Sequence, residues 1–567
     1  MIDVKESLEK NVKLKKAPRI VLSSIVKASK KILHEDDINK FLLENIDSIG
    51  IDFIDAVLEY FNIDFTRKQS EIENIPHTGR VVIIANHPLG ALDALSLIKL
   101  VYSVRQDVKI LANDLLNSFD PIKEFLLPVN ILKQKFSKST AQMMTKHLED
   151  EGALIIFPSG EVSRSSLTGI KDKKWKKGFL NTALKTQSPI LPVHIKSKNS
   201  MLFYSASIVN NTLGTLLLPH ELFKSKKKRI TISVGNLIPY DSFRSLPIKK
   251  EELVNIFRKH IYLIGRGKSG VFETETAIAH PERAKEIRNE LKNCKLLGET
   301  SDNKKIYLYD YKQGSIMLKE LGRLRELSFR KVGEGSGLRR DVDEYDKNYE
   351  HIILWSDEDL EIVGAYRVAN TKKVVVDAKN ALYTSTLFTY SKEFEKYFDS
   401  SLELGRSFVQ PKYWGSRALD YLWQGIGAYL KHHPEVTHMF GPVSLSGKNP
   451  KIANDLIVHF YNTYFEEKDL VTAKSRYELG NYYKLNYKNL FSGKEFVNDF
   501  RELKSILSEY NTNIPTLYKQ YVDLFEDGGI KFLDFCVDED FNSVDGFILC
   551  DISKIKEKKR KRYIDKI

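Results

Sequence analysis

The chain has 567 residues, too many for a single hydrophobic core, so we expect about two to four domains. Its composition, with 42% hydrophobic and 29% charged residues, is that of a globular protein with a sizeable core. The 88 Lys and Arg residues exceed the 75 Asp and Glu residues, and the net charge of +13 favours an anionic partner such as lipid headgroups or an acidic carrier protein. The sequence contains no nucleic-acid-binding motif, so we expect no nucleic acid partner.

The three cysteines, Cys294, Cys536 and Cys550, are far apart and odd in number, which argues against a disulfide framework and for a reducing compartment. Without a CxxC or CxxH cluster we expect no structural zinc site. The N-terminus lacks a signal-peptide pattern, and no apolar run reaches the roughly 18 residues that span a bilayer. We therefore expect a cytoplasmic protein that is peripheral on the inner membrane.

Residues 1–75 are predicted to be helical. Within residues 19–33, apolar residues gather on one side and Lys27, Lys30 and Lys31 lie elsewhere, so this helix could rest on an anionic membrane. It could equally pack against the following domain, as most amphipathic helices do. A second helix is predicted at residues 52–61.

Strands and helices alternate through residues 76–265, which we assign to the first domain. Alternation of this kind predicts an α/β fold with a mostly parallel sheet. The predicted strands are 81–85, 108–112, 153–157, 190–195 and 230–235, and the predicted helices are 93–102, 137–150 and 175–186.

The first predicted strand, at residues 81–85, runs into a tight turn that carries a histidine and an aspartate. Asn86, His87, Pro88 and Gly90 form the turn, and Asp93 begins the next helix. Sites in α/β folds usually lie at such strand ends. A buried carboxylate beside an imidazole fixes the tautomer of the ring, so the pair could deprotonate a hydroxyl. The alternative is a structural histidine at the end of a strand.

A second strand followed by a Pro-Gly turn occurs at residues 154–164, with the sequence LIIFPSGEVSR. Its candidate substrate-binding residues are Phe157, Pro158, Ser159, Gly160, Glu161 and Arg164. Basic residues then crowd around Trp175 and again at residues 224–229. Each run is either a solvated face or a surface attracted to anionic lipid.

Residues 266–300 are predicted to be a linker that contains a charged helix at 281–296. The second domain spans residues 301–552. Residues 553–567 form a basic tail with few apolar residues, which we expect to be frayed or bound to the surface, and we assign it no chemistry.

In the second domain, charged residues recur at short spacings around a predicted strand at residues 361–368, which carries Arg367 at its end. Asp343 and Asp346 are three residues apart, as are Glu403 and Arg406. The latter two would share a face in a helix but point to opposite faces in a strand. A glutamate at a strand end is a reasonable general base for a protonated amine. The alternative is a set of structural ion pairs.

A loop with Lys412, Gly415 and Arg417 precedes a predicted helix at residues 418–430. Cations and a glycine in a loop that opens a helix suit the binding of a phosphate or pyrophosphate arm.

The NHP-x-G-x-LD pattern at residues 86–93 and the FPSGE pattern at 157–161 together resemble the PlsC-like glycerolipid acyltransferases, in particular their hemolysin-like branch. That family pairs a histidine–aspartate motif with a downstream FPEG-type motif. This sequence departs from it in two places: five residues separate His87 from Asp93 where four are usual, and Ser159 replaces the usual glutamate, with Glu161 following. The resemblance implies that His87 and Asp93 are catalytic and that Asn86, Gly90 and residues 157–164 bind substrate.

The second half resembles the GNAT-like N-acyltransferases related to acyl-homoserine-lactone synthases and to the ornithine-lipid N-acyltransferase. The matching residues are Arg325 and Phe329 four apart, Asp343 and Asp346, Arg367, and the Glu403 and Arg406 pair. The order of the two halves resembles the bifunctional ornithine-lipid synthases of some bacteria.

These resemblances imply an α/β protein of two domains, a PlsC-like O-acyltransferase followed by a GNAT-like N-acyltransferase. The second domain would acylate the α-amine of an amino acid from a 3-hydroxyacyl carrier protein, with Glu403 as base and the other charged residues holding the amino acid. The first domain would then acylate the 3-hydroxyl from a second thioester. No metal or cofactor is implied, with acyl-acyl carrier protein as co-substrate. The amino acid stays open among ornithine, glycine, serine and glutamine.

Three alternatives remain from the sequence. The first half could be a lysophospholipid acyltransferase with a lipid-binding or carrier-binding second half. The second half could instead acylate protein lysines, as toxin-activating acyltransferases do. Finally, the chain could be a membrane-binding module without enzymatic activity.

Overall fold

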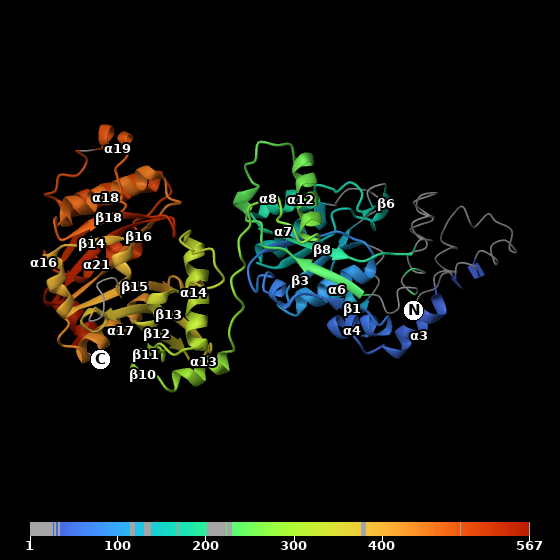
Figure 1. Ribbon diagram of the computed structural model, residues 1–567, viewed down its shortest axis with the longest axis horizontal. Coiled ribbons are helices and arrows are strands. Elements are labelled where there is room, and N and C mark those ends of the chain that lie inside the picture. The colour runs from blue at the N-terminus through green and yellow to red at the C-terminus, as the bar shows by residue number, and fades with distance from the viewer. Residues whose placement is uncertain are drawn as a thin grey trace. The chain divides into compact units, whose positions relative to one another are not determined.

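The computed structural model describes residues 34–565 except 114–119, 130–137, 167–168, 201–220, 222, 224–228, 376–380 and 488, together with residues 26, 27, 30 and 31. The chain forms two compact units, unit 1 at Met1–His280 and unit 2 at Pro281–Ile567 (Figure 1). Most of the amphipathic segment 19–33 and of the basic run 224–229 lies outside the described residues. In the described parts of both units, no helix is long and apolar enough to cross a bilayer.

Unit 1 is built on a seven-stranded sheet whose neighbouring strands run parallel except for one antiparallel pair, β8 and β9. The prediction of an α/β fold with a mostly parallel sheet is therefore confirmed. The strands, in sheet order, are β1 (Asp64–Thr66), β9 (Arg229–Val234), β8 (Ile190–Lys196), β2 (Val81–Ala85), β5 (Ala153–Ile156), β3 (Val108–Asn113) and β4 (Leu126–Val129).

The central strand β2 is buried along its whole length because helices cover both faces of the sheet. Side chains of a strand alternate between the faces. Val81, Ile83 and Ala85 accordingly join one apolar cluster, and Val82 and Ile84 join another.

The first of these clusters contains residues of α4 (Gly50–Tyr60) and α6 (Ala91–Tyr102). The second contains residues of α7 (Lys138–Glu149), α8 (Gly178–Thr186) and α12 (Lys250–Ile264). The remaining elements of unit 1 are α3 (Glu35–Glu44), α5 (Gln69–Ile72), η3 (Asp120–Phe125), η5 (Tyr240–Ser242) and the hairpin β6 (Arg164–Ser166) and β7 (Gly169–Lys171).

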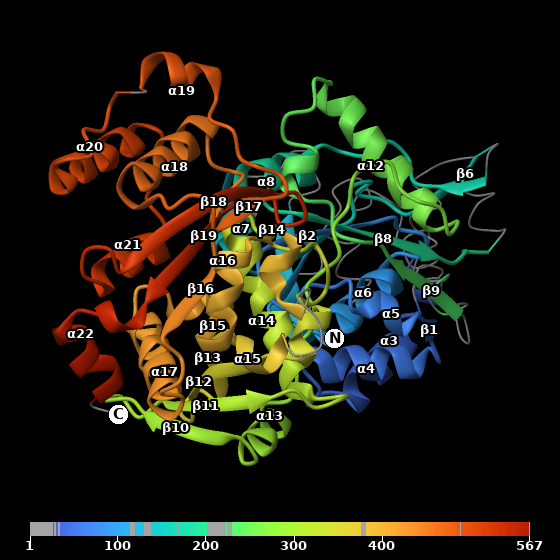
Figure 2. The same cartoon turned by 60° about the vertical axis from the view of Figure 1, so that its left-hand side comes forward.

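Unit 2 contains an eight-stranded sheet, seen with its helices in Figure 2. Its strands, in sheet order, are β10 (Lys295–Glu299), β11 (Lys305–Asp310), β12 (Glu350–Ser356), β13 (Glu361–Asn370), β15 (Ser401–Val409), β16 (His438–Ser446), β19 (Ser543–Asp551) and β18 (Ile530–Asp538). All neighbours are antiparallel except β15 and β16. That parallel pair is registered only from Ser401 to Glu403 against His438 to Phe440.

Helices pack on both faces of this sheet. The largest cluster joins it to α17 (Ala418–His432), α18 (Lys451–Phe465), α20 (Phe496–Glu509) and α21 (Thr516–Leu524), and another cluster joins it to α13 (Ala284–Leu291) and α14 (Ile316–Val332). Shorter elements are η6 (Glu344–Lys347), α15 (Thr371–Val374), η8 (Tyr383–Thr386), β14 (Phe388–Tyr390), α16 (Lys392–Glu395), η9 (Lys396–Ser400), η10 (Pro411–Tyr413), β17 (Val471–Ala473) and α19 (Asn481–Asn486).

One segment differs from the sequence-based expectation. Residues 284–299, expected in a linker, form α13 and β10 of unit 2. Of the two alternatives for the basic tail, frayed or bound to the surface, its described part fits the second: η11 (Ile552–Lys554), α22 (Glu557–Arg560) and η12 (Lys561–Asp565) continue the fold, and Tyr563 is buried. A Cβ on Gly427 of α17 would lie 1.8 Å from the Tyr563 carbonyl oxygen, so a glycine is needed for this close approach. The basic composition of the tail did not indicate that two of its residues, Tyr563 and Ile564, are buried.

Candidate active sites

In unit 1, the turn after β2 is held by a fully buried carboxylate. Asp93 lies in the first turn of α6, and its Oδ2 accepts the backbone N–H groups of Leu89 (2.6 Å) and Gly90 (3.0 Å). Gly90 has a φ of 92°, a conformation that favours glycine. Through this turn the five residues between His87 and Asp93 still allow the two side chains to meet.

The His87 ring lies between this carboxylate and an aromatic ring. Its Nδ1 is 3.2 Å from Oδ2 of Asp93, and the ring stacks on Phe157 with centroids 4.0 Å apart. The His87 side chain is 17% exposed, whereas Asp93 is inaccessible. A carboxylate facing Nδ1 favours a proton there, which leaves Nε2 with a lone pair that can accept a proton. The structure thus brings together the predicted dyad and Phe157 of the second motif.

A second buried carboxylate, which the sequence did not single out, holds the backbone of His87. Oδ1 of Asp172 accepts the His87 N–H (3.2 Å) and the Ser163 hydroxyl (2.5 Å), and Oδ2 accepts the Trp175 indole N–H (2.9 Å). Burial raises the pKa of Asp172, and these hydrogen bonds oppose the rise. Ser163 also donates its N–H to the His87 carbonyl at 2.7 Å. Asp172 was missed because it lies within the basic stretch around Trp175.

The other predicted residues of unit 1 shape the loops around the dyad. Asn86 ties β2 to β8, because its amide exchanges hydrogen bonds of 2.8 and 2.7 Å with the Ile195 backbone. In the second motif, the Pro158 carbonyl accepts the Lys176 N–H, and the Ser159 hydroxyl donates to the Glu161 carbonyl. Gly160 has a φ of 66°, and the Glu161 carboxylate pairs with Lys173 at 3.3 Å. Arg164 is buried at the start of β6.

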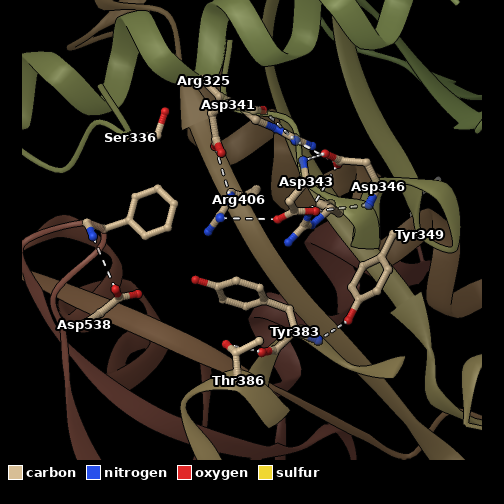
Figure 3. A network of polar contacts seen from close by, with 12 residues as sticks. Arg325, Ser336, Asp341, Asp343, Asp346, Tyr349, Tyr383, Thr386, Arg406 and Asp538 are labelled. Carbon is tan, nitrogen blue, oxygen red and sulfur yellow. Dashed lines mark hydrogen bonds and ion pairs between the residues drawn. The ribbon is translucent and has the colours of Figure 1, made fainter. Parts of the chain in front are cut away.

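In unit 2, a buried network of arginines and aspartates joins α14, η6, β12 and β13 (Figure 3). Oδ1 of Asp346 accepts from Arg325 Nη1 at 2.8 Å and from Arg367 Nη1 at 3.2 Å. Arg367 also donates to Oδ1 of Asp343 at 2.5 Å. The Asp346 pKa is lowered because these arginines overcome the effect of burial. Arg367 does not end its strand, since β13 continues to Asn370.

His351 of β12 completes this network as a neutral ring. Its Nδ1 lies 3.0 Å from Arg325 Nη2, and a guanidinium can only donate, so Nδ1 must accept. The proton therefore sits on Nε2, which lies 3.7 Å from Oδ1 of Asp346. Burial, reinforced by Arg325, lowers the His351 pKa to about 3. No periodicity or motif in the sequence had pointed to this histidine.

Arg406 reaches the same network through an irregularity in β15. Between Gly405, which pairs with Arg367, and Phe408, which pairs with Ala365, the strand carries one extra residue, and Arg406 has a φ of 45°. Such a bulge resets the alternation of side chains. Glu403 and Arg406 therefore both face the side of Arg367, although a regular strand would point residues three apart to opposite faces.

The Arg406 guanidinium is held by acids and aromatic rings. Its Nε is 3.1 Å from Asp341 Oδ2, and its Nη2 is 3.4 Å from Asp343 Oδ2. Its central carbon lies 4.6 Å from the Tyr383 ring centroid and 4.4 Å from that of Phe541. These are cation–π contacts, which stabilise a partly desolvated guanidinium.

Glu403 is buried and satisfied by hydroxyl and backbone donors rather than by an arginine. Its Oε1 accepts the N–H (2.8 Å) and the hydroxyl (2.5 Å) of Thr384, and its Oε2 accepts the hydroxyl of Tyr349. Burial raises the Glu403 pKa, which these hydrogen bonds oppose. Tyr349 also accepts the Tyr383 N–H at 2.8 Å, so Glu403 is connected to the residue that stacks on Arg406.

The remaining predicted residues of unit 2 lie in other surroundings. Phe329 packs against the apolar cluster of α13 and α14. In the 412–418 loop, Lys412 pairs with Glu361 and with Asp359, Gly415 has a φ of 79°, and Arg417 lies 3.5 Å from Asp420. In the described residues of both units, no cluster of three His, Cys, Asp or Glu side chains is placed to hold a metal.

The neutral state of His351 leads to a prediction about acid stability. The unfolded chain binds a proton at His351 near its ordinary pKa of about 6.5, whereas the folded chain does so only near pH 3. Stability is therefore lost as the pH falls below 6.5, at up to about 1.4 kcal/mol per pH unit. The His351→Gln variant lacks this contribution, so its free energy of unfolding should fall less between pH 6 and pH 4 than that of the wild type. Urea unfolding of both proteins measures the difference. Parallel pH profiles would show that His351 is not neutral when folded.

Each half of the chain is similar to proteins of a known family. Residues 11–269 match the family model described as Acyltransferase, and residues 324–424 match the Acetyltransferase (GNAT) domain. A glycine N(alpha)-acyltransferase of Phocaeicola vulgatus is 33% identical over 49% of this chain and 90% of its own length. A lyso-glycine lipid O-acyltransferase of Bacteroides thetaiotaomicron is 33% identical over 43% of this chain and 90% of its own.

An L-ornithine N(alpha)-acyltransferase of Brucella abortus is 28% identical over 41% of this chain and 81% of its own length. Among solved structures, the acyltransferase PlsC of Thermotoga maritima aligns over 42% of this chain and 81% of its own, at 19% identity with a TM-score of 0.26. The relatives thus include enzymes named for both kinds of acyl transfer. The chain belongs to the aminolipid acyltransferases: its first half is of the Acyltransferase family that includes lyso-glycine lipid O-acyltransferases, and its second half is of the GNAT family that includes glycine N(alpha)-acyltransferases.

Proposed function

We propose that this chain makes an acylated amino-acid lipid by two successive acyl transfers, N-acylation in unit 2 and O-acylation in unit 1. The observation that carries the proposal is that one chain matches, over 90% of each relative's length, both a glycine N(alpha)-acyltransferase and a lyso-glycine lipid O-acyltransferase. Glycine is the proposed amino acid, because the glycine N(alpha)-acyltransferases of two species are 31–33% identical to this chain and the L-ornithine N(alpha)-acyltransferases of four species are 25–28% identical.

In the N-acylation step, the α-amine of glycine attacks the thioester carbon of a 3-hydroxyacyl carrier protein. A C–N bond forms, the C–S bond breaks, and the thiol leaves. Glu403 takes the amine proton, through water or through the hydroxyl groups bonded to it. Its raised pKa makes the ionised carboxylate a stronger base.

The charged network would order the amino-acid site. Arg406 is held by Asp341 and Asp343 and lies against the rings of Tyr383 and Phe541. It would hold the glycine carboxylate, with Arg325, Arg367 and Asp346 fixing the position of Asp343. The paired part of the parallel strands β15 and β16 ends at Glu403, and the thioester would lie beside this residue.

In the O-acylation step, Nε2 of His87 takes the proton of the 3-hydroxyl of the lyso-lipid. The hydroxyl oxygen attacks a second acyl thioester, so that a C–O bond forms and the C–S bond breaks. Asp93 stabilises the protonated imidazole. The loop from Phe157 to Arg164, which stacks on His87 and is bonded to its backbone, would position the acceptor. Acyl carrier protein and an anionic membrane surface are the proposed partners, and no cofactor is required.

The first prediction from the proposed function concerns the unit 1 dyad and uses the lipids of an expressing bacterial host. In His87→Ala, the O-acylated lipid should be lost and the lyso-lipid should accumulate. Asp93→Asn keeps an oxygen for the Leu89 and Gly90 N–H groups but disfavours the required tautomer, so O-acylation should fall by about 10²- to 10⁴-fold. Lipid mass spectrometry measures both products.

Asp107→Asn serves as a matched control, because Asp107 pairs with Arg105 elsewhere in unit 1. It should leave the lipid pattern unchanged. Normal O-acylation in His87→Ala would contradict the assignment of the dyad, and acylation of lysophosphatidate without any N-acyl product would favour an ordinary lysophospholipid acyltransferase.

The second prediction concerns Glu403. In Glu403→Gln, formation of the lyso-lipid should fall by about 10²-fold or more, because an amide cannot accept the amine proton. O-acylation of supplied lyso-lipid by the same protein should be unchanged, which checks that unit 1 is intact. Tyr349→Phe, which removes one hydroxyl donor to Glu403 but keeps the carboxylate, should retain more N-acylation than Glu403→Gln. If Glu403→Gln formed lyso-lipid at the normal rate, Glu403 would not be the base.

A further inference from the structure

A basic cavity lies beside α12 in unit 1, apart from the residues assigned above to proton transfer. Its volume is about 620 Å³, within the usual size range of small-molecule sites. Six of its lining residues are basic: Arg164, Lys171, Lys173, Arg258, Lys259 and Arg266. A concave surface lined by one sign of charge concentrates ligands of the opposite sign.

The charge of this cavity is only partly neutralised by the protein. The lining includes Asp172, but its carboxylate is occupied by His87, Ser163 and Trp175. In the part of the chain that the structure describes, Lys259 and Arg266 make no ion pair with a carboxylate. Lys173 does pair with Glu161, at 3.3 Å.

The Arg258 guanidinium in the wall of the cavity is only partly used by the protein. Its Nη2 donates to the Asp172 carbonyl, but its Nε is buried without a hydrogen-bond partner among the described residues. The local positive charge also affects His194, whose pKa is lowered to about 4 by burial and then by Lys196 and Arg266. The excess of cations in the cavity lining is the observation that points to an anionic ligand.

The cavity wall and the catalytic turn form one hydrogen-bonded unit. Arg258 and Tyr262 of α12 hold the Asp172 backbone, the latter accepting its N–H at 2.8 Å. The Asp172 carboxylate in turn accepts the His87 backbone N–H. A ligand bound at this wall is therefore fixed relative to His87.

We infer that this cavity binds the phosphate of the phosphopantetheine arm that carries the acyl thioester for O-acylation. The inference rests on the proposed O-acyltransferase function of unit 1. The lyso-lipid acceptor would present a single carboxylate, for which one arginine suffices, whereas a phosphate ester offers several oxygens to several cations. The same phosphate group occurs in acyl carrier protein and in acyl-coenzyme A.

The test uses the full chain and the double variant Lys259→Gln/Arg266→Gln, which removes two exposed cations of the cavity and spares Arg258. The single variant Lys249→Gln, at the start of the same helix and outside the cavity, is the control. Isothermal titration with coenzyme A should detect a binding site in unit 1 in addition to any thioester-binding site in unit 2. The double variant should weaken the unit 1 site by about tenfold, and the control should not.

The kinetics of O-acylation then distinguish an effect on binding of the acyl thioester from an effect on binding of the lyso-lipid. In the double variant, the KM for the acyl thioester should rise by about tenfold, while the KM for lyso-lipid and the rate of N-acylation stay unchanged. Unchanged coenzyme A binding would overturn the inference, as would a rise confined to the lyso-lipid KM or a loss confined to binding of phosphatidylglycerol vesicles. If wild-type chain bound coenzyme A at this cavity but performed no O-acylation, the proposed function would fail while the site would stand.

Discussion

A carboxylate that is cut off from water must find its hydrogen-bond donors inside the protein, and both candidate sites depend on this constraint. In unit 1, Asp93 accepts two backbone N–H groups and lies against His87, so one residue fixes the turn and the ring together. In unit 2, Asp346 is shared by Arg325 and Arg367. Removing one partner of such a pair leaves an uncompensated buried charge, which costs about 3–5 kcal/mol.

The same constraint explains where the backbone departs from regular structure. Gly90, the residue before α6, has a positive φ, and the turn that it forms brings Asp93 of this helix next to His87. Arg406, a non-glycine residue, takes a positive φ in a bulge and thereby reaches Asp341 and Asp343. That conformation costs about 1–2 kcal/mol for an L-residue. The ion pairs and ring contacts of Arg406 are the interactions that offset this cost.

Much of this could be predicted from the sequence. The strand, turn and helix around His87 follow from local patterns, whereas the pairing of this motif with the one at Phe157 came from the family resemblance. The alternation of elements also predicted the mostly parallel sheet of unit 1. The two aspartates at 343 and 346 were recognised by their spacing, and they do cap the same turn and bind the same arginine.

What the sequence could not supply was the contacts between distant segments. Asp172 is 85 positions from His87, and Tyr349 is 54 positions from Glu403, so no spacing rule connects them. The bulge at Arg406 depends on its pairing with β13 and cannot be seen in β15 alone. Phe329, which was chosen by family resemblance, packs against an apolar cluster, and the loop at 412–418, which was chosen for its cations and glycine, forms surface ion pairs; their predicted binding roles stay predictions.

The central claim is that one chain carries out both acyl transfers in order. The most direct measurement is a time course with purified wild-type chain, isotope-labelled glycine, 3-hydroxyacyl carrier protein and a second acyl thioester, followed by lipid mass spectrometry. The account predicts that the label enters the N-acylated lyso-lipid first and then passes into the O-acylated lipid. Label that appears in neither product, or an O-acylated lipid that forms without a labelled lyso-lipid, would contradict it.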